Sequence, residues 1–268
     1  MSQPAASAAL ARLRDALRDP VLVRAGRGME PTARALELAE AARPHLAALT
    51  AALAGALPFA PATDSRIFRL GCTDAVALAV LPALTTTLRQ QAPRCDLTLR
   101  IGDYRSLPAM LDTAEAGTIA GWLRDEAAAS ARTRVLRHAP WVVLRCAASA
   151  PVADAAGFAA RPHALVTPAG DLAGPLDRLL AAQGLRRRVT LGLTNFALLP
   201  AVLAGTDMLA TVPDFVARRL AAPGTLAIDP CPVALPPVTN SIAWRAVLDR
   251  DPAEAWFRRA LIEAFSQS

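Results

Sequence analysis

The sequence predicts an α/β protein: a body of alternating strands and helices, preceded by a helix, a basic hairpin and a second, longer helix. Short extended segments alternate with helical ones from residue 66 onward. This order favours a mostly parallel sheet with helices on its faces. Leucines recur at spacings of three and four in residues 2–18 and again in 31–56, which indicates two amphipathic helices before the body.

Length and composition exclude several classes of protein. The chain has 268 residues, 53% of them hydrophobic and 19% charged, which is typical of a globular protein with one large domain or two lobes. It has no apolar run of about 18 residues and no signal-like start, so we expect a cytoplasmic protein with no membrane partner. The scattered cysteines contain no CxxC pair and are expected to be reduced thiols. They are Cys72, Cys95, Cys146 and Cys231.

The net charge of +6 has two possible explanations. Every basic residue apart from histidine is Arg, and no Lys is present. Arg forms bidentate contacts with phosphate and guanine, which suits a nucleic-acid partner. A GC-rich genome, which favours Arg codons, explains the same composition. The charge alone therefore does not identify a partner.

The first helix, residues 2–18, has one apolar face formed by Leu10, Leu13 and Leu17. Ser2 and Pro4 are typical of a helix N-cap and first turn. The remaining face is either solvated surface or a surface that contacts a partner. Its polar side chains are Ser2, Gln3, Ser7 and Arg12.

A basic hairpin is expected next. Residues 21–24 can extend as a strand, Gly26 and Gly28 allow a tight turn, and Met29 can begin the return strand. Arg24 and Arg27 would then lie at or near the tip.

A long helix is predicted for residues 31–56, with Pro31 near its first turn. Pro44 should kink it or remove one backbone hydrogen bond, at a cost of about 3 kcal/mol. Its apolar stripe has no partner close in the sequence, which favours packing on a second copy of the chain; packing on its own body is the alternative. The dimer contacts would be Leu46, Leu49 and Leu53. Residues 57–65 then indicate a linker.

The body contains the alternating elements. Strands are expected at 67–73, 95–103, 118–123, 163–168, 188–193, 208–213 and 238–247, with a pair of strands in 133–148. Helices are expected at 75–93, 104–117, 174–185, 195–205 and 251–265, the last with Asp251 as its N-cap.

No catalytic constellation is present. The sequence lacks a GxSxG elbow, a P-loop and an HExxH motif. Its histidines, His45, His138 and His163, are too dispersed to indicate a zinc site. We therefore expect a protein that is not an enzyme and that has neither cofactor nor metal.

The segment SQPAASAALARLRDALRDPVLVRAGRGMEPTARALEL, residues 2–38, resembles the recognition helix, wing and linker-helix start of LysR-type transcriptional regulators. From Arg66 onward the chain is similar to that family's effector-binding domain. Trp244 and the Asp251-Pro252-x-x-x-Trp256 pattern look most like the branch that responds to aromatic and flavonoid inducers.

The resemblance implies a domain organisation. A partial winged helix-turn-helix would span 1–30, a linker and dimerisation helix 31–57, and a periplasmic-binding-protein-like two-lobed effector domain 66–268. Lobe one would be 66–145 plus 238–268, and lobe two 148–235. The chain would cross between the lobes near 146–151 and 236–240, with the ligand between them.

The chain departs from the family pattern in two ways. Ala8 stands where many relatives carry Arg or His, which removes one expected phosphate contact. In the family two further helices precede the recognition helix, whereas the printed chain begins inside the turn. Either the start lies about 30 residues upstream or the gene is truncated. Without those helices the apolar face of residues 2–18 would lack much of its core, at about 1.5–3 kcal/mol per exposed leucine.

The implied function is ligand-responsive transcription regulation by a homodimer or homotetramer on double-stranded DNA. The alternative is a stand-alone small-molecule-binding protein with a degenerate DNA-binding domain. Base edges would be contacted by Gln3 and Ser7, and phosphates by Ser2, Arg12, Arg24 and Arg27.

The effector, an aromatic compound or a carboxylate, would be held at strand and helix ends. Phe196 would either stack on it or pack in the core, and Asp74 would either face it or cap the following helix. The expected pocket residues are Cys72, Thr73, Asp74, Thr167, Asn195 and Phe196.

Overall fold

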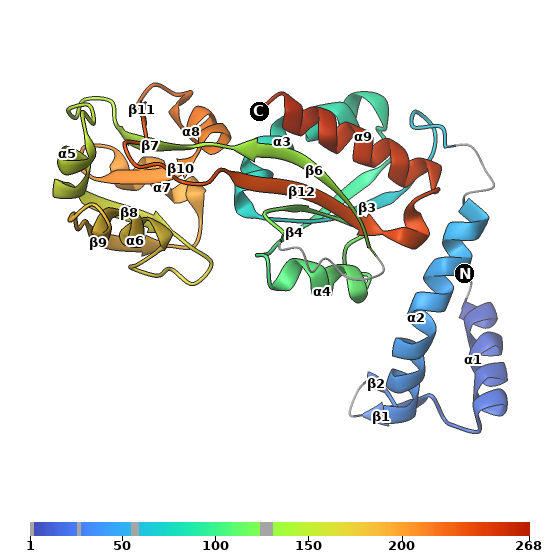
Figure 1. Ribbon diagram of the computed structural model, residues 1–268. Helices are drawn as coiled ribbons and strands as arrows, with labels where there is room; N and C mark the ends of the chain where they lie inside the picture. The colour runs from blue at the N-terminus through green and yellow to red at the C-terminus, as the bar shows by residue number, and fades with distance from the viewer. Residues whose placement is uncertain (1–2, 26–27, 55–58, 124–130) are drawn as a thin grey trace. The chain divides into compact units, whose positions relative to one another are not determined.

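The computed structural model describes residues 3–25, 28–54, 59–123 and 131–268, without the side chains of 3–5 and 51–54. The chain divides into two compact units, Met1–Ala56 and Leu57–Ser268 (Figure 1). We call them the N-terminal unit and the effector unit. Within the described residues, no helix is long and apolar enough to cross a membrane.

The N-terminal unit contains the predicted helix, hairpin and long helix. They are α1 (Gln3–Leu17), β1 (Leu22–Ala25), β2 (Gly28–Pro31) and α2 (Ala33–Ala54). The two strands pair antiparallel, with Ala25 opposite Gly28. The long helix begins later than predicted because Pro31 is the last residue of β2, paired with Leu22. α2 continues through Pro44.

Asp19 and Thr32 close the base of the hairpin. The Asp19 carboxylate accepts hydrogen bonds from Val21 N and from Thr32 Oγ1, both at 2.7 Å. Thr32 Oγ1 also accepts from Ala35 N at 3.1 Å, so this side chain caps the start of α2. These hydrogen bonds, that from Thr32 first, lower the pKa of Asp19.

The N-terminal unit has no buried side chain among residues 6–25 and 28–50, where burial is described. Leu13 is 49% exposed, and Leu10 and Leu17 are half-buried. In the described residues the apolar face of α1 is therefore exposed or half-buried.

The effector unit is built on two five-stranded sheets, one in each lobe (Figure 1). Lobe one has the order β4-β3-β5-β12-β6, and lobe two has the order β11-β7-β10-β8-β9. The strands of lobe one are β3 (Ile67–Cys72), β4 (Asp96–Ile101), β5 (Thr118–Gly121), β6 (Ala131–Ala139) and β12 (Val238–Arg245). Those of lobe two are β7 (Trp141–Cys146), β8 (Pro162–Val166), β9 (Arg188–Leu193), β10 (Leu209–Pro213) and β11 (Leu226–Pro230).

Both sheets are mixed rather than mostly parallel, which corrects the sequence-based expectation. β3 is parallel to β4 and β5, and β8 is parallel to β9 and β10. β12 is antiparallel to β5 and β6, and β7 to β10 and β11. Alternating strands and helices account for the parallel half of each sheet. The strands that lead from one lobe to the other have no crossover helix, and they pair antiparallel.

Helices cover both faces of the lobe-one sheet. α3 (Asp74–Gln91) and α9 (Pro252–Ser266) pack together on one face, and α4 (Ser106–Asp112) lies on the other (Figure 1). Asp251 caps α9 as predicted, with Oδ1 accepting from Ala253 N and Glu254 N. The remaining helices are α5 (Ala155–Ala160), α6 (Pro175–Ala181), η1 (Phe196–Leu198), α7 (Leu199–Leu203), α8 (Asp214–Ala221) and η2 (Ala246–Leu248).

The core of lobe one extends into the predicted linker and into lobe two. Phe59, within the expected linker, packs against Phe68 and Trp256 at ring-centroid distances of 6.3 and 5.7 Å. Phe215 of α8 meets Phe265 of α9 edge to face at 5.2 Å. The two lobes therefore share one apolar cluster along this face.

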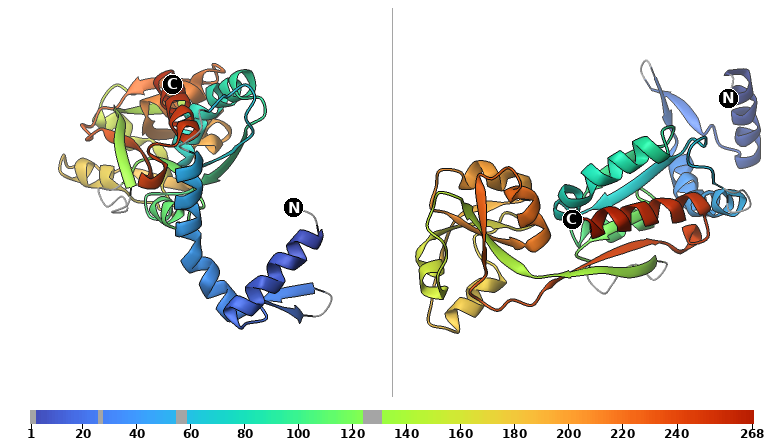
Figure 2. Two further views of the ribbon diagram at one scale, coloured as in Figure 1. Left: turned by 90° about the vertical axis from the view of Figure 1, so that its right-hand side faces the viewer. Right: turned by 90° about the horizontal axis from the view of Figure 1, so that it is seen from above.

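The chain passes from lobe one to lobe two at Pro140, earlier than the predicted crossing at 146–151. β7 belongs to the lobe-two sheet, although it follows β6 directly and was assigned to lobe one through residue 145. β6 and β12 run side by side toward lobe two (Figure 2). Trp141 Nε1 donates to Pro236 O at 2.9 Å and so joins the two crossing segments.

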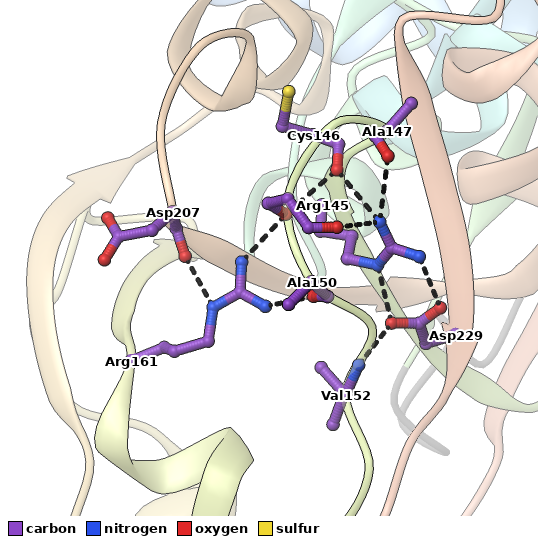
Figure 3. Close-up of polar contacts among 9 residues, drawn as sticks. Arg145, Cys146, Ala147, Ala150, Val152, Arg161, Asp207 and Asp229 are labelled. Carbon is purple, nitrogen blue, oxygen red and sulfur yellow. Dashed lines mark hydrogen bonds and ion pairs between the residues drawn. The ribbon is translucent and has the colours of Figure 1, made fainter.

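The segment predicted as the first crossing is instead fixed within lobe two (Figure 3). Arg145 donates to both carboxylate oxygens of Asp229, at 2.7 and 3.3 Å, and to the carbonyl of Ser149 at 2.6 Å. Val152 N donates to the same carboxylate at 2.7 Å. Arg161 adds hydrogen bonds to the carbonyls of Ala150 and Asp207. Asp229 lies in β11, a strand that the sequence did not predict.

Candidate functional site

The candidate site lies at the carboxyl ends of the parallel strands, where α/β sheets commonly bind ligands. We call the segments that follow these strands the strand-end loops. In lobe one they follow β3, β4 and β5, and in lobe two they follow β8 and β9. Their polar and aromatic residues include Thr73, Asp74, Tyr104, Arg105, Trp122, Thr167, Asp171, Asn195 and Phe196.

A hydrogen bond joins the loops of the two lobes. Asp74 Oδ2 accepts from Phe196 N at 2.7 Å, across 122 positions of sequence. Burial raises the pKa of this carboxyl, and the N–H groups of Phe196 and Ala75 partly offset that effect. The loop after β3 and the loop before η1 therefore face each other, which is the arrangement that the predicted pocket requires.

Thr73, rather than Asp74, caps α3. Its Oγ1 accepts from Val76 N at 3.4 Å, and its own N–H donates to Ala120 O. Gly121 has a φ of +151°, and a Cβ at this position would lie 2.5 Å from Thr73 Cγ2. Glycine at 121 therefore allows the end of β5 to approach the Thr73 side chain closely.

Cys72 is fully buried in the core of lobe one. Burial, together with the nearby charge of Asp74, raises the pKa of its thiol to about 12. The thiol is neutral at physiological pH and packs as a small apolar side chain beneath the loop that carries Thr73.

The predicted pocket residues of lobe two have partners within their own loops. Thr167 Oγ1 donates to Asp171 Oδ2 and accepts from Asp171 N, both at 2.8 Å. Asn195 Oδ1 accepts from Ala197 N at 2.7 Å and caps η1. Phe196 is half-buried and packs against the shared core. Each loop is thus held in shape by its own side chains.

Three further residues stand at the ends of β4 and β5 and were missed in the sequence. The rings of Tyr104 and Trp122 are 5.0 Å apart and inclined at 58°, and Trp122 is 44% exposed. Arg105 Nε donates to Tyr104 Oη at 3.1 Å, with the guanidinium 5.2 Å from the Tyr104 ring centre. Their position at the ends of two predicted strands was the available signal.

The pKa of Arg105 also depends on a charge in lobe two. Its pKa is raised first by Tyr104, with further contributions from the negative charges of Asp103 and Asp171. Asp171 belongs to the loop after β8. The charge of Asp171 is the smallest of these contributions, and within the described residues the two side chains share no hydrogen bond or ion pair.

The predicted DNA-contacting and dimer residues lie in the N-terminal unit. Ser7, Arg12 and Arg24 are exposed on α1 and β1. The Leu46 and Leu49 side chains of α2 are 61% and 58% exposed. Outside the described side chains lie Ser2, Gln3, Arg27 and Leu53.

In the part of the chain that is described, no group of three or more His, Cys, Asp or Glu side chains is placed to hold a metal ion. His163 is fully buried and Nε2 lies 2.9 Å from Phe158 O. His138 lies 2.9 Å from Thr239 Oγ1 on the paired strands β6 and β12. Both contacts are structural.

The fold is thus that of a two-lobed α/β ligand-binding domain, preceded by a helix, a two-stranded wing and a long helix. Family models match both parts: the LysR substrate binding domain over residues 61–266, and the bacterial regulatory helix-turn-helix protein, lysR family, over residues 1–36. The chain belongs to the LysR family of transcriptional regulators, which are not enzymes.

Relatives match along nearly the whole chain. It is 33% identical to the HTH-type transcriptional activator NahR of Pseudomonas putida, over 99% of this chain and 89% of that protein. It is 31% identical to the HTH-type transcriptional activator NagR of a Ralstonia species, over 100% and 90%. A solved structure of the Pseudomonas aeruginosa regulator PA0477 superposes with a TM-score of 0.71 at 33% identity, covering 97% of this chain and 87% of that one.

Proposed function

We propose that this regulator contacts double-stranded DNA through α1 and the β1–β2 wing. It assembles in the cytoplasm as a homodimer or homotetramer through α2. It senses an aromatic or carboxylate effector at the strand-end loops. The Asp74–Phe196 hydrogen bond is the observation that carries the effector site. It brings together two loops in which the sequence separately predicted ligand-contacting residues. A ligand bound there touches both lobes, so its binding energy depends on their relative position.

The DNA contacts are supported by exposure and by geometry. Ser7 and Arg12 are exposed on α1, and Arg24 is exposed on the paired strand β1. Gln3 and Ser7 would contact base edges, while Ser2, Arg12, Arg24 and Arg27 would contact phosphates.

The test uses a chain extended upstream by the family's two preceding helices. Arg27→Ala and Arg24→Ala should each weaken binding to all DNA sequences and reduce the salt slope by about one. Arg188→Ala, an exposed arginine of lobe two, is the control and should change neither quantity. Unchanged affinity and slope for both wing variants would remove the wing from the interface.

A stand-alone ligand-binding protein remains the second candidate, since α1 has no core beneath its leucines. Footprinting with the chain as printed separates the two. Protection of an operator supports a DNA-binding regulator. Absence of protection by both the printed and the extended chain supports the second candidate.

The exposed leucines of α2 support dimerisation. Leu49→Asp would bury an unpaired charge in the seam between two α2 helices and should dissociate the dimer in light scattering. Ala41→Asp, at an exposed position off the Leu46–Leu49 stripe, is the matched control. A dimer that survives Leu49→Asp would place the interface elsewhere.

The effector site is tested by calorimetry with small aromatic carboxylates, starting with benzoate. Thr73→Val and Asn195→Leu should each weaken binding by about 1–3 kcal/mol, because each leaves a ligand oxygen without its partner. Thr113→Val, an exposed threonine of lobe one, is the control. Equal affinity in all variants would move the ligand away from these loops.

A further inference from the structure

Two of the donors at the predicted pocket already have partners in the protein. The N–H of Phe196 binds the Asp74 carboxylate at 2.7 Å. A ligand carboxylate at that place would have to displace Asp74 and lie beside its charge. The Thr167 hydroxyl is bonded to Asp171 in the same way. At these two donors a carboxylate of the protein already occupies the place of an anionic ligand, so we looked for a cation on the strand-end loops that forms no ion pair.

Arg105 is the cation placed for this task. Its guanidinium is exposed at the end of β4, and within the described residues only Nε is hydrogen-bonded, to Tyr104 Oη. The two terminal nitrogens form the planar fork that binds a carboxylate in bidentate fashion. Two carboxylates act on its charge, first Asp103 of its own loop and then Asp171 of lobe two, and among the described residues neither forms an ion pair with the guanidinium.

An aromatic surface adjoins this cation. Tyr104 and Trp122 contact each other at 5.0 Å, and the indole is 44% exposed although it is large and apolar. A flat ring stacked on this pair would cover the exposed indole face and gain the energy of aromatic packing. Because Arg105 lies 5.2 Å from the Tyr104 ring centre, ring and carboxylate could be bound by neighbouring groups.

We propose that Tyr104, Arg105 and Trp122 form the recognition site for a planar aromatic carboxylate. The ring packs on Trp122 and Tyr104, and the carboxylate binds the Arg105 fork. This proposal rests on the proposed function, in which the effector binds at the strand-end loops.

Three probe compounds separate the parts of the site. Benzoate carries both ring and charge, benzamide lacks the charge, and cyclohexanecarboxylate lacks the aromatic face. In calorimetry with the full chain, benzoate should bind, and the other two should bind at least tenfold more weakly. No detectable benzoate binding to the unmodified chain would overturn the proposal.

Two variants then assign the roles. Arg105→Gln should weaken benzoate binding at least tenfold and leave benzamide binding within twofold. Trp122→Leu should weaken benzoate binding and leave cyclohexanecarboxylate binding within twofold. Arg188→Gln is the control for loss of one positive charge.

A loss in Arg105→Gln that is confined to benzoate excludes a merely structural role, since a damaged loop would bind benzoate and benzamide more weakly alike. Equal losses for benzoate and benzamide in Arg105→Gln would overturn the proposal. If Thr73→Val and Asn195→Leu weaken benzoate while Arg105→Gln does not, this assignment fails and the effector site of the proposed function stands.

Discussion

The two units of this chain use leucine in opposite ways. In the effector unit Leu84, Leu107 and Leu144 are fully buried, whereas in the N-terminal unit Leu13, Leu46 and Leu49 are half-exposed or more. The effector unit is held by apolar burial. In the N-terminal unit, hydrogen bonds of Asp19 and Thr32 join the base of the hairpin to the start of α2. The same periodic pattern therefore predicts a helix in both units but a core only where other elements cover it.

The largest effect should come from the buried ion pair of lobe two. Asp229→Ala leaves Arg145 buried without its charge partner and frees Val152 N, and should lower the free energy of unfolding by about 3–5 kcal/mol. All four tryptophans lie between residues 122 and 256, so urea unfolding followed by tryptophan fluorescence reports on the effector unit. Asp229→Asn keeps an acceptor for Val152 N and should lower the free energy of unfolding by less than Asp229→Ala does. A loss under 1 kcal/mol in Asp229→Ala would contradict the role of the pair.

A matched pair of leucine substitutions tests the comparison directly. Leu84→Ala creates a cavity in the effector core and should cost about 2–5 kcal/mol. Leu13→Ala removes the same atoms from a half-exposed site and should change helix melting, followed by circular dichroism, by less than about 0.5 kcal/mol. Similar costs at the two positions would mean that α1 is covered in solution.

Acid should weaken the effector unit through His163. Burial lowers the pKa of this imidazole from 6.5 to about 4. The unfolded chain therefore takes up a proton near pH 6.5 while the folded chain does not, and stability falls as the pH drops between those values. The loss reaches on the order of 3 kcal/mol at pH 4. His163→Gln retains a donor for Phe158 O and should flatten this part of the curve, as measured by urea midpoints at pH 7 and pH 4.5.

The smallest effect is expected at the base of the wing. Thr32→Ala removes the cap of α2 and one hydrogen bond to Asp19, and should cost about 1 kcal/mol in the N-terminal unit. Amide hydrogen exchange at Ala35 measures it. Thr50→Ala, whose hydroxyl bonds to Leu46 O inside α2, is the comparison and should leave that amide unchanged.

Local signals in the sequence were sufficient for much of the fold. The wing, the long helix and the Asp251 cap follow from glycine, proline and capping residues, whose effects reach only a few positions. The position at which the chain crosses from lobe one to lobe two, Pro140, was not predictable in this way, because apolar segments lie on both sides of it. β11 was missed because its segment, LAIDP, is short and contains Asp and Pro.

The candidate site, like the fold, contains residues that local sequence signals predict and contacts that they do not. The sequence nominated Thr73, Asp74 and Asn195 from their positions beside strands and helices. It could not show that Asp74 binds Phe196, because that partner lies 122 positions away and comes close only when the lobes assemble. Tyr104 and Trp122 follow predicted strands, but their side chains meet only in the folded protein, so the sequence does not show that they form one aromatic surface.

The central position of β12 in the lobe-one sheet has a consequence for biosynthesis. Lobe two is one continuous stretch, Trp141–Pro230, so all its strands are synthesised before β12. The lobe-one sheet lacks the strand between β5 and β6 until residue 245, and its covering helix α9 until the end of translation. Because domains fold as units during synthesis, the edges of β5 and β6 stay unpaired until the last part of the chain has emerged, and lobe one can be completed only at the end of synthesis.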